Sequence, residues 1–231
     1  MVDRVERFLE QKYYNDLFLR KSMSALYQNY ASWGIKDRKF DQDFCDGRND
    51  HFYPYLWEMI LARHLKKLSL HLSSKDEGPD FKTQHQGQTI WIEATCPTPK
   101  KPPKDATSHL ASALKGKKDK LTGRNLKNVI YKPGYLTKNI VAPTDAYVIA
   151  INACRLGNID IHTTALKVAT QAFQACDYTG VSAILSTSQG IEAVAGDKST
   201  IFLFHNPLAK NKLPFDFLGA DEEYVIDFRD T

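Results

Sequence analysis

Two short stretches, residues 78–83 (GPDFKT) and residues 89–95 (TIWIEAT), decide the fold of this chain. Gly78 and Pro79 favour a turn, after which the first stretch continues as a short strand. The second stretch is rich in β-branched and aromatic residues, which favour strands. The few residues between them include Gly87, as is common in a hairpin connection. The two stretches therefore predict a β-hairpin.

Apolar patterns on both sides of the hairpin predict further elements. Apolar residues at near-helical intervals predict helices before and after it, and the continuous apolar run 146–152 (AYVIAIN) predicts a buried central strand. Residues 34–50 are polar and are expected to form a loop. This order of elements predicts an α/β protein with a sheet flanked by helices. The expected helices cover residues 3–30, about 54–72, 105–127 and about 162–175, and the remaining expected strands cover 182–185 and 201–204.

The composition is that of an ordinary globular protein. The chain has 231 residues, 42% of them hydrophobic and 25% charged, which excludes disordered and fibrous classes. We expect a single domain, in which a helical N-terminal segment of about residues 1–35 precedes a core of about residues 52–206. The apolar runs are much shorter than the roughly 18 residues of a membrane span, and the N-terminus lacks an apolar signal core. With four scattered cysteines that are expected to stay reduced, these features predict a cytoplasmic protein without a membrane partner.

Basic residues are concentrated in one segment. Residues 100–138 contain eleven lysine or arginine residues and two acidic residues, a net charge of +9, whereas the whole chain carries +4. Such a block is typical either of a face that binds a polyanion or of a solvated lysine-rich helix. In the first case, the expected phosphate-binding residues are Lys100, Lys101, Lys104, Lys118, Lys120 and Arg124.

Two acidic residues of the hairpin are expected to meet. Asp80 opens the first strand and Glu93 lies late in the second, so strand pairing brings them together. Glu93 shares a face with Trp91 and Thr95, because strand side chains alternate between faces. The neighbouring Trp91 predicts that Glu93 is buried, and a buried glutamate needs a partner. Two converging carboxylates repel each other and favour a cation, for which Mg²⁺ or Mn²⁺ is suited.

The residues 78–81 (GPDF) and 90–95 (IWIEAT) resemble the motif of the PD-(D/E)xK nuclease superfamily, and the resemblance covers about residues 52–152. It implies a restriction-endonuclease-like mixed sheet flanked by helices. It also implies a metal-dependent endonuclease that hydrolyses phosphodiester bonds of DNA. In that family the acids corresponding to Asp80 and Glu93 hold Mg²⁺ or Mn²⁺, together with the carbonyl corresponding to Ala94. An acid on the preceding helix, here Glu58, often assists.

One position departs from the family pattern. The lysine expected two residues after the glutamate is Thr95, which cannot supply a positive charge. Lys117 follows Leu114 by three residues on the apolar stripe of the next helix, so we expect it to point toward the sheet and to replace the missing lysine. Lys82 and Lys120 are the alternatives.

Other functions remain open. Thr95 is also compatible with a catalytically inactive module that binds nucleic acid or a protein partner. A nuclease acting on RNA or on particular nucleic-acid structures is a further alternative. DNA is the expected partner, and a homodimer is possible. The chain has no glycine-rich phosphate loop and no Gly-x-Ser-x-Gly or His-Glu-x-x-His motif, which argues against the corresponding enzyme classes.

Overall fold

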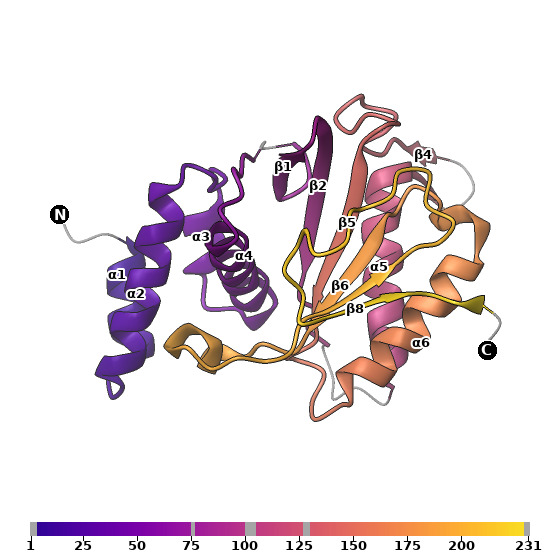
Figure 1. Cartoon of the computed structure of the whole chain (residues 1–231). Helices are drawn as coiled ribbons and strands as arrows, with labels where there is room; N and C mark the ends of the chain where they lie inside the picture. The colour runs from indigo at the N-terminus through magenta and orange to yellow at the C-terminus, as the bar shows by residue number, and fades with distance from the viewer. Residues whose placement is uncertain (1–3, 75–76, 100–104, 127–129, 229–231) are drawn as a thin grey trace.

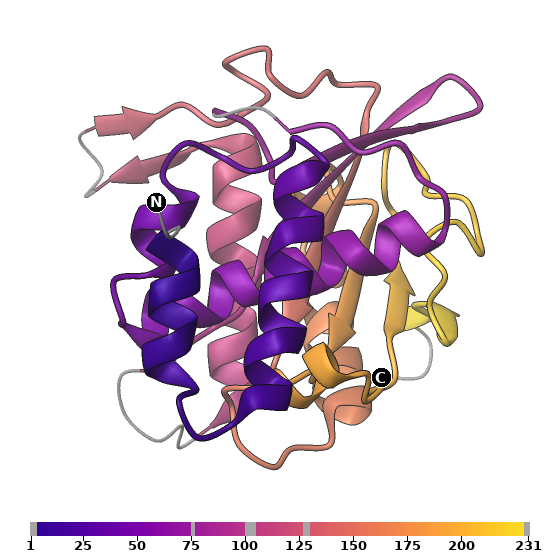
Figure 2. The same cartoon turned by 90° about the vertical axis from the view of Figure 1, so that its left-hand side faces the viewer.

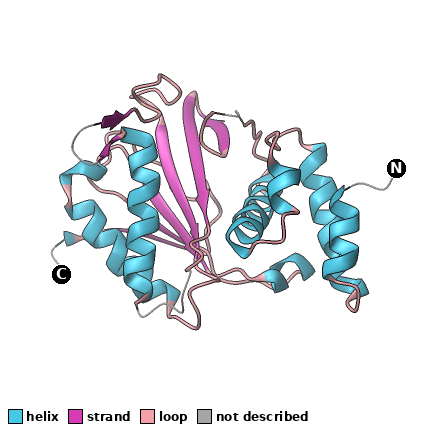
Figure 3. Cartoon of the chain, turned by 180° about the vertical axis from the view of Figure 1, so that it is seen from behind, coloured by secondary structure: helices cyan, strands magenta, loops and turns pink. Residues whose placement is uncertain are grey.

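The protein is a three-layer α/β structure in which helices cover both faces of a mixed sheet (Figures 1 and 3). The computed structural model describes residues 4–74, 77–99, 105–126 and 130–228. The predicted α/β class and the sheet flanked by helices are thus confirmed. The helices are α1 (Arg4–Lys12), α2 (Leu17–Ser32), α3 (Phe40–Phe44), α4 (Asn49–Lys67), α5 (Ala106–Thr122) and α6 (Ile161–Gln174). The strands are β1 (Phe81–His85), β2 (Gln88–Thr95), β3 (Arg124–Leu126), β4 (Ile130–Lys132), β5 (Ala146–Asn152), β6 (Ala183–Thr187), β7 (Phe202–His205) and β8 (Glu222–Val225).

The main sheet has the strand order β1-β2-β5-β6-β7-β8. The predicted β1–β2 hairpin is antiparallel, and β5 then joins β2 in parallel through the crossover helix α5. Strand β6 is parallel to β5, β7 is antiparallel to β6, and β8 is parallel to β7. All seven residues of β5 are buried, as its apolar sequence predicts for a central strand.

The N-terminal helices form one outer layer. Helices α1 to α4 pack on the sheet face that carries Ile90, Ile92 and Ala94. Figure 2 looks onto this layer, with α1 and α2 in front of α4. Helix α4 contacts the sheet directly, because the Trp57 indole nitrogen donates a hydrogen bond to the Ala150 carbonyl at 3.1 Å. This contact fixes the position of α4, and therefore of Glu58, relative to the central strands.

Helices α5 and α6 form the opposite layer. They pack on the face that carries Trp91, Tyr147 and Ile149, so alternate residues of β2 and β5 belong to two separate cores, as the predicted alternation of strand side chains requires. Glu93 belongs to this α5 face. No helix in the described part of the chain is long and apolar enough to cross a bilayer.

The N-terminal segment differs from the single helix expected over residues 3–30. It forms two helices, because Asp16 accepts a hydrogen bond from the backbone N–H of Leu19 at 2.8 Å and so caps the start of α2. The sequence contains no proline or glycine between the two helices. The local sequence feature that indicates a break there is the Asn15-Asp16 pair, since both residue types favour helix N-caps. The four residues between α1 and α2 reverse the chain.

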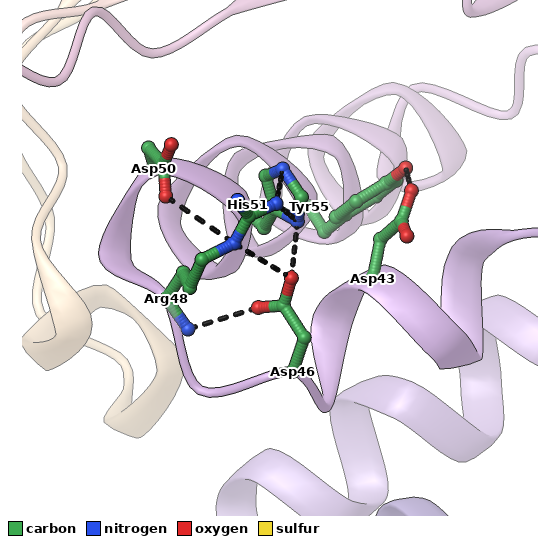
Figure 4. Close-up of polar contacts among 6 residues, drawn as sticks. All are labelled: Asp43, Asp46, Arg48, Asp50, His51 and Tyr55. Atoms are coloured by element: carbon green, nitrogen blue, oxygen red, sulfur yellow. Dashed lines mark hydrogen bonds and ion pairs between the residues drawn. The ribbon is translucent and has the colours of Figure 1, made fainter.

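Residues 34–50 were expected to form a loop, but they contain the short helix α3 and the start of α4 (Figure 4). Asp46 accepts a hydrogen bond from the backbone N–H of Arg48 at 2.9 Å, forms an ion pair with the Arg48 side chain and contacts the imidazole of His51. The Tyr55 hydroxyl donates to Asp43 at 3.0 Å and joins α3 to α4. These contacts allow α4 to begin at Asn49, five residues before Pro54.

The structure ends α5 earlier than expected and adds two elements that the sequence did not predict, the β3–β4 pair and strand β8. Helix α5 ends at Thr122 rather than near residue 127, because Gly123 adopts a positive φ of 85° and turns the chain. A Cβ at Gly123 would lie 2.3 Å from the Tyr131 hydroxyl oxygen, so the close return of the chain also requires glycine. The chain then forms the small antiparallel β3–β4 pair, and the strand β8 near the C-terminus is the second addition.

Candidate active site

Asp80 and Glu93 meet at the open end of the β1–β2 hairpin. Phe81 is paired with Ile92 in the antiparallel register, so the next residues outward are Asp80 and Glu93. An Asp80 carboxylate oxygen accepts a hydrogen bond from the backbone N–H of Ala94 at 2.6 Å. The expected convergence of the two carboxylates is therefore present, and the end of β2 fixes the position of Asp80.

Asp80 is partly buried beside another acid, which makes its ionised form unfavourable. Burial, followed by the charge of Glu93, raises the pKa of Asp80 to about 7. Lys117, Lys120 and the hydrogen bond from Ala94 oppose this shift without cancelling it. Near neutral pH, Asp80 therefore exchanges readily between its protonated and ionised forms, and a nearby cation would favour the ionised form.

Glu93 is fully buried and is held ionised by two lysines. Its Oε1 atom accepts hydrogen bonds from Lys117 Nζ at 2.6 Å and from Lys120 Nζ at 2.8 Å. Burial alone would raise the pKa of Glu93, but the charges and hydrogen bonds of Lys117 and Lys120 outweigh it and lower the pKa. The Tyr135 hydroxyl lies 3.5 Å from the other carboxylate oxygen.

Glu58 reaches the same group of charges from α4, on the opposite face of the sheet. Its pKa is raised well above the ordinary value by burial and then by the charge of Asp80, while Lys117 opposes the shift. This mutual influence of Glu58, Asp80 and Lys117 places the acid of α4 in the electrostatic environment of the hairpin acids. The site therefore draws its charged groups from the sheet and from both helical layers.

Lys117 and Lys120 are the two lysines that contact Glu93, whereas position 95 carries an uncharged threonine. Thr95 ends β2 and lines the pocket described below. Both lysines come from α5, three residues apart, and contact the same carboxylate oxygen. Their surroundings differ, because the Lys117 side chain is 16% exposed and that of Lys120 is 51% exposed. The alternative Lys82 instead places its ammonium over the Trp91 ring, 5.2 Å from the centroid.

A basic pocket opens beside Glu93. It has a volume of about 490 Å³ and lies between α5, the end of β2 and the residues around β3 and β4. Asp119 is the single acid among its lining residues, against five cations, so the pocket is suited to an anion. The basic lining residues are Lys117, Lys120, Arg124, Lys132 and Lys138.

The expected phosphate-binding residues fall into three groups. Lys120 and Arg124 line the pocket. Lys118 does not, because it is only 8% exposed and forms ion pairs with Asp177 at 2.6 Å and Asp119 at 3.2 Å. It lies on the buried stripe of α5 with Leu110, Leu114 and Leu121, so the prediction that Lys118 binds phosphate is wrong. Lys100, Lys101 and Lys104 lie outside the described residues.

Three further residues of the pocket were missed by sequence reasoning. Lys132, Tyr135 and Lys138 follow α5 by ten or more residues and return to it through the β3–β4 pair. The backbone N–H of Tyr135 donates to the Lys120 carbonyl at 2.8 Å, which fixes this return. Lys132 and Lys138 belong to the basic segment 100–138, which could have indicated a place in an anion-binding pocket. No feature of the sequence indicated that Tyr135 lines the pocket.

The end of the hairpin carries oxygen donors of the type that a hard divalent cation prefers. Asp80 and Glu93 supply two carboxylates, and the Ala94 carbonyl lies on the Asp80 side of β2, since the N–H and C=O of one strand residue point the same way. Burial, followed by the charge of Glu93, raises the pKa of Asp80, and a bound cation would oppose this shift. Within the described ranges, no group of three or more His, Cys, Asp or Glu side chains is arranged to hold a metal, so Glu58 does not join the pair as a third ligand.

The raised pKa predicts how Asp80 affects stability. Asp80 ionises near pH 4 in the unfolded chain but near 7 in the folded one, so its charge destabilises the fold increasingly as pH rises from 4 to 7. Asp80→Asn should therefore increase the free energy of unfolding of the metal-free protein above pH 7, by a few kcal/mol at most, because one pKa unit corresponds to about 1.4 kcal/mol. The gain should vanish near pH 4. Urea unfolding at the two pH values measures it, and an equal change at both would contradict the shifted pKa.

Comparison with known proteins provides no family for this chain. Neither a family model, nor a curated protein, nor a solved structure matches it.

Proposed function

We propose that this chain is a metal-dependent nuclease that hydrolyses phosphodiester bonds of DNA. The observation that carries the proposal is the Lys117–Glu93 ion pair beside Asp80, at the edge of a pocket lined by basic side chains. Acid, acid and lysine are the residue types of the PD-(D/E)xK motif. Here, however, the lysine comes from α5 instead of from β2.

The order of elements supports a restriction-endonuclease-like core. Helix α4 is followed by the β1–β2 hairpin, then by the crossover helix α5 and the parallel strand β5. Ser73 adds an antiparallel bridge on the outer side of β1, where it exchanges two backbone hydrogen bonds with Lys82 at 2.7 and 2.9 Å. The acids of the motif lie at the end of the hairpin, and the two lysines that contact Glu93 also line the basic pocket.

Each charged residue has a distinct role in this proposal. Asp80, Glu93 and the Ala94 carbonyl would hold Mg²⁺ or Mn²⁺, which when bound lowers the pKa of a coordinated water and stabilises charge on the phosphate. Lys117 would stabilise the negative charge that develops on the phosphate oxygens, and Glu93 orients its ammonium group. The raised pKa of Glu58 favours its protonated form, which can donate a hydrogen bond to water.

A catalytically inactive nucleic-acid-binding module is the second candidate. The position of Thr95 favours it, and so does the pairing of the Glu93 carboxylate with two lysines, which already neutralises its charge. In this case the basic pocket binds phosphate and the acids only hold the lysines in place.

Cleavage and metal binding, measured on the same samples, test the proposal. Wild-type protein with Mg²⁺ or Mn²⁺ should cut plasmid or oligonucleotide DNA, and either metal should raise the melting temperature by mass action. Asp80→Ala should lose both effects, whereas Glu10→Gln, an exposed acid on α1, should keep both. Metal binding should weaken as pH falls below about 7, because protonated Asp80 is a poor ligand.

The outcomes separate the candidate functions. If the protein cleaves RNA but not DNA, the substrate is RNA and the nuclease proposal holds for RNA. If millimolar metal leaves the melting temperature of the wild type unchanged and no nucleic acid is cut, the nuclease proposal fails and the binding module remains.

DNA binding should depend on the exposed cations of the pocket. Neutralising Arg124, Lys132 and Lys138 with glutamine should flatten the plot of log K against log salt, by about 0.9 per lost phosphate contact. Neutralising the exposed Arg7, Lys21 and Lys39 of the opposite helical layer changes net charge equally and should leave the slope unchanged. Fluorescence anisotropy without metal measures both. Equal slopes for the two triple variants would show that the pocket does not bind the backbone.

A further inference from the structure

Two cysteines face each other where the two central parallel strands end. Cys96 directly follows β2, and Cys154 lies two residues after the end of β5. The strands are paired in parallel up to Thr95 and Ile151, so the segments that leave them run side by side. The two sulfur atoms are 3.8 Å apart, although the residues are separated by 58 positions in the sequence.

The surrounding hydrogen bonds hold this arrangement. The Asn152 side chain accepts a hydrogen bond from the backbone N–H of Cys154 at 3.1 Å and donates one to the Gln189 carbonyl at 2.7 Å. Asn152 is itself buried. The loop that carries Cys154 is thereby tied to the chain after β6, and its thiol stays directed at Cys96. A disulfide requires the sulfurs to approach to about 2.05 Å, which calls for a short side-chain movement.

The two thiols differ in reactivity. The hydrogen bond with Cys96 and the charge of Arg155 lower the pKa of Cys154 against the opposing effect of burial. The same hydrogen bond and burial raise the pKa of Cys96. Cys154 is also the more exposed of the two, since Cys96 is 4% exposed. The buried Nε of Arg155 has no hydrogen-bond partner among the described residues and is a donor that a thiolate could use. The greater exposure of Cys154 and the direction of both pKa shifts favour Cys154 as the attacking thiol and Cys96 as the resolving thiol.

We propose that Cys96 and Cys154 form a reversible disulfide when the protein encounters a hydroperoxide. The Cys154 thiolate attacks one peroxide oxygen, the O–O bond breaks, and Cys154 becomes a sulfenic acid. The Cys96 sulfur then attacks the Cys154 sulfur and displaces its hydroxyl group. With hydrogen peroxide, the two thiols lose two electrons and two protons in total, and the peroxide is reduced to two molecules of water. A dithiol reductant reverses the reaction by thiol–disulfide exchange.

The bond would connect the ends of the two strands on which the candidate site depends. Cys96 follows Thr95, which lines the basic pocket, and lies three residues after Glu93. Oxidation would therefore tie the end of β2 to the loop after β5. The disulfide itself does not depend on the nuclease proposal, because its formation is read from the covalent structure alone.

The experiment uses the 231-residue chain carrying Cys176→Ser, because Cys176 is exposed and could otherwise form disulfides between molecules. After treatment with hydrogen peroxide, digestion without reductant should yield the cross-linked peptides of Cys96 and Cys154. Dithiothreitol should remove the cross-link. With Cys96→Ala added, Cys154 should remain a sulfenic acid that dimedone labels.

Three outcomes would overturn the proposal. One is oxidation of Cys154 to the sulfinic acid without a cross-link. Another is a cross-link that involves Cys45 instead. The third concerns the roles of the two thiols. If dimedone labels Cys96 in the Cys154→Ser variant more than it labels Cys154 in the Cys96→Ala variant, the two thiols do not have the assigned roles. Should Cys96→Ala fail to fold, the cross-link measured in the Cys176→Ser protein still decides whether the disulfide forms.

Discussion

Glu93→Gln should abolish DNA cleavage and lower the free energy of unfolding by about 3 kcal/mol, the cost of breaking a buried ion pair. The glutamine has nearly the same shape as Glu93 but no charge, so Lys117 and Lys120 lose the carboxylate that they contact at 2.6 and 2.8 Å. The destabilisation should diminish below about pH 4. Because the pKa of Glu93 is lowered in the folded state, its contribution to stability is present above its unfolded pKa and is lost as pH falls through the folded pKa.

Glu223→Gln provides the matched control for this prediction. Glu223 is a half-buried glutamate whose carboxylate contacts His205 Nε2 at 2.8 Å, but it lies on β8 at the other edge of the sheet. It should reduce stability without reducing cleavage. Unfolding in urea and initial cleavage rates below the melting transition measure the two effects. If both variants cleave DNA at the wild-type rate, Glu93 has no part in catalysis.

Lys117→Ala should reduce the turnover number for DNA cleavage about 100-fold or more, equivalent to roughly 2.7 kcal/mol of transition-state stabilisation. Its ammonium group is largely shielded from solvent, and its charge acts on Glu58 and Asp80 as well as on Glu93. In the proposed reaction, a cation in this place would stabilise the charge that develops during phosphate hydrolysis more than it would stabilise the bound substrate. We therefore expect turnover to fall while the affinity for DNA changes little.

Lys115→Ala is the control for this variant, because Lys115 is an exposed residue of the same helix. It should leave turnover unchanged. Lys118→Ala should instead destabilise the protein, because Lys118 is buried and paired with Asp177, yet it should not alter turnover of the folded protein. Lys120→Ala should have a smaller effect than Lys117→Ala, since half of the Lys120 side chain is exposed. A larger loss in Lys120→Ala would assign the catalytic role to Lys120.

The parts of the fold that could be predicted from the sequence are those decided by local pattern. The β-prone sequence of β2 and the continuous apolar run of β5 correspond to strands in the structure. The turn residues before Asp80 placed it at the open end of the hairpin, opposite Glu93. In each case the pattern of neighbouring residues carries the information, and distant contacts only reinforce it.

The parts that could not be predicted depend on contacts between distant segments. Strand β8 is short and contains two consecutive glutamates, and it forms because β7 offers its edge. The helical periodicity after Leu114 allows either Lys117 or Lys118 on the buried stripe, since helix neighbours are three or four residues apart. The structure buries Lys118, because Asp177 from the segment after α6 pairs with it. No pattern within α5 contains that information.

The distribution of the charged site over three layers has a consequence for the order of folding. An isolated β1–β2 hairpin would bring Asp80 and Glu93 together without the two lysines that contact Glu93, and the repulsion between the carboxylates would oppose strand pairing. The compensating ammonium groups arrive only when α5 docks on the sheet. The hairpin is therefore stabilised by a helix that is synthesised after it. Before α5 is made, pairing of Asp80 with Glu93 is electrostatically unfavourable. Docking of α5 on the sheet therefore stabilises the hairpin and assembles the charged site in the same step.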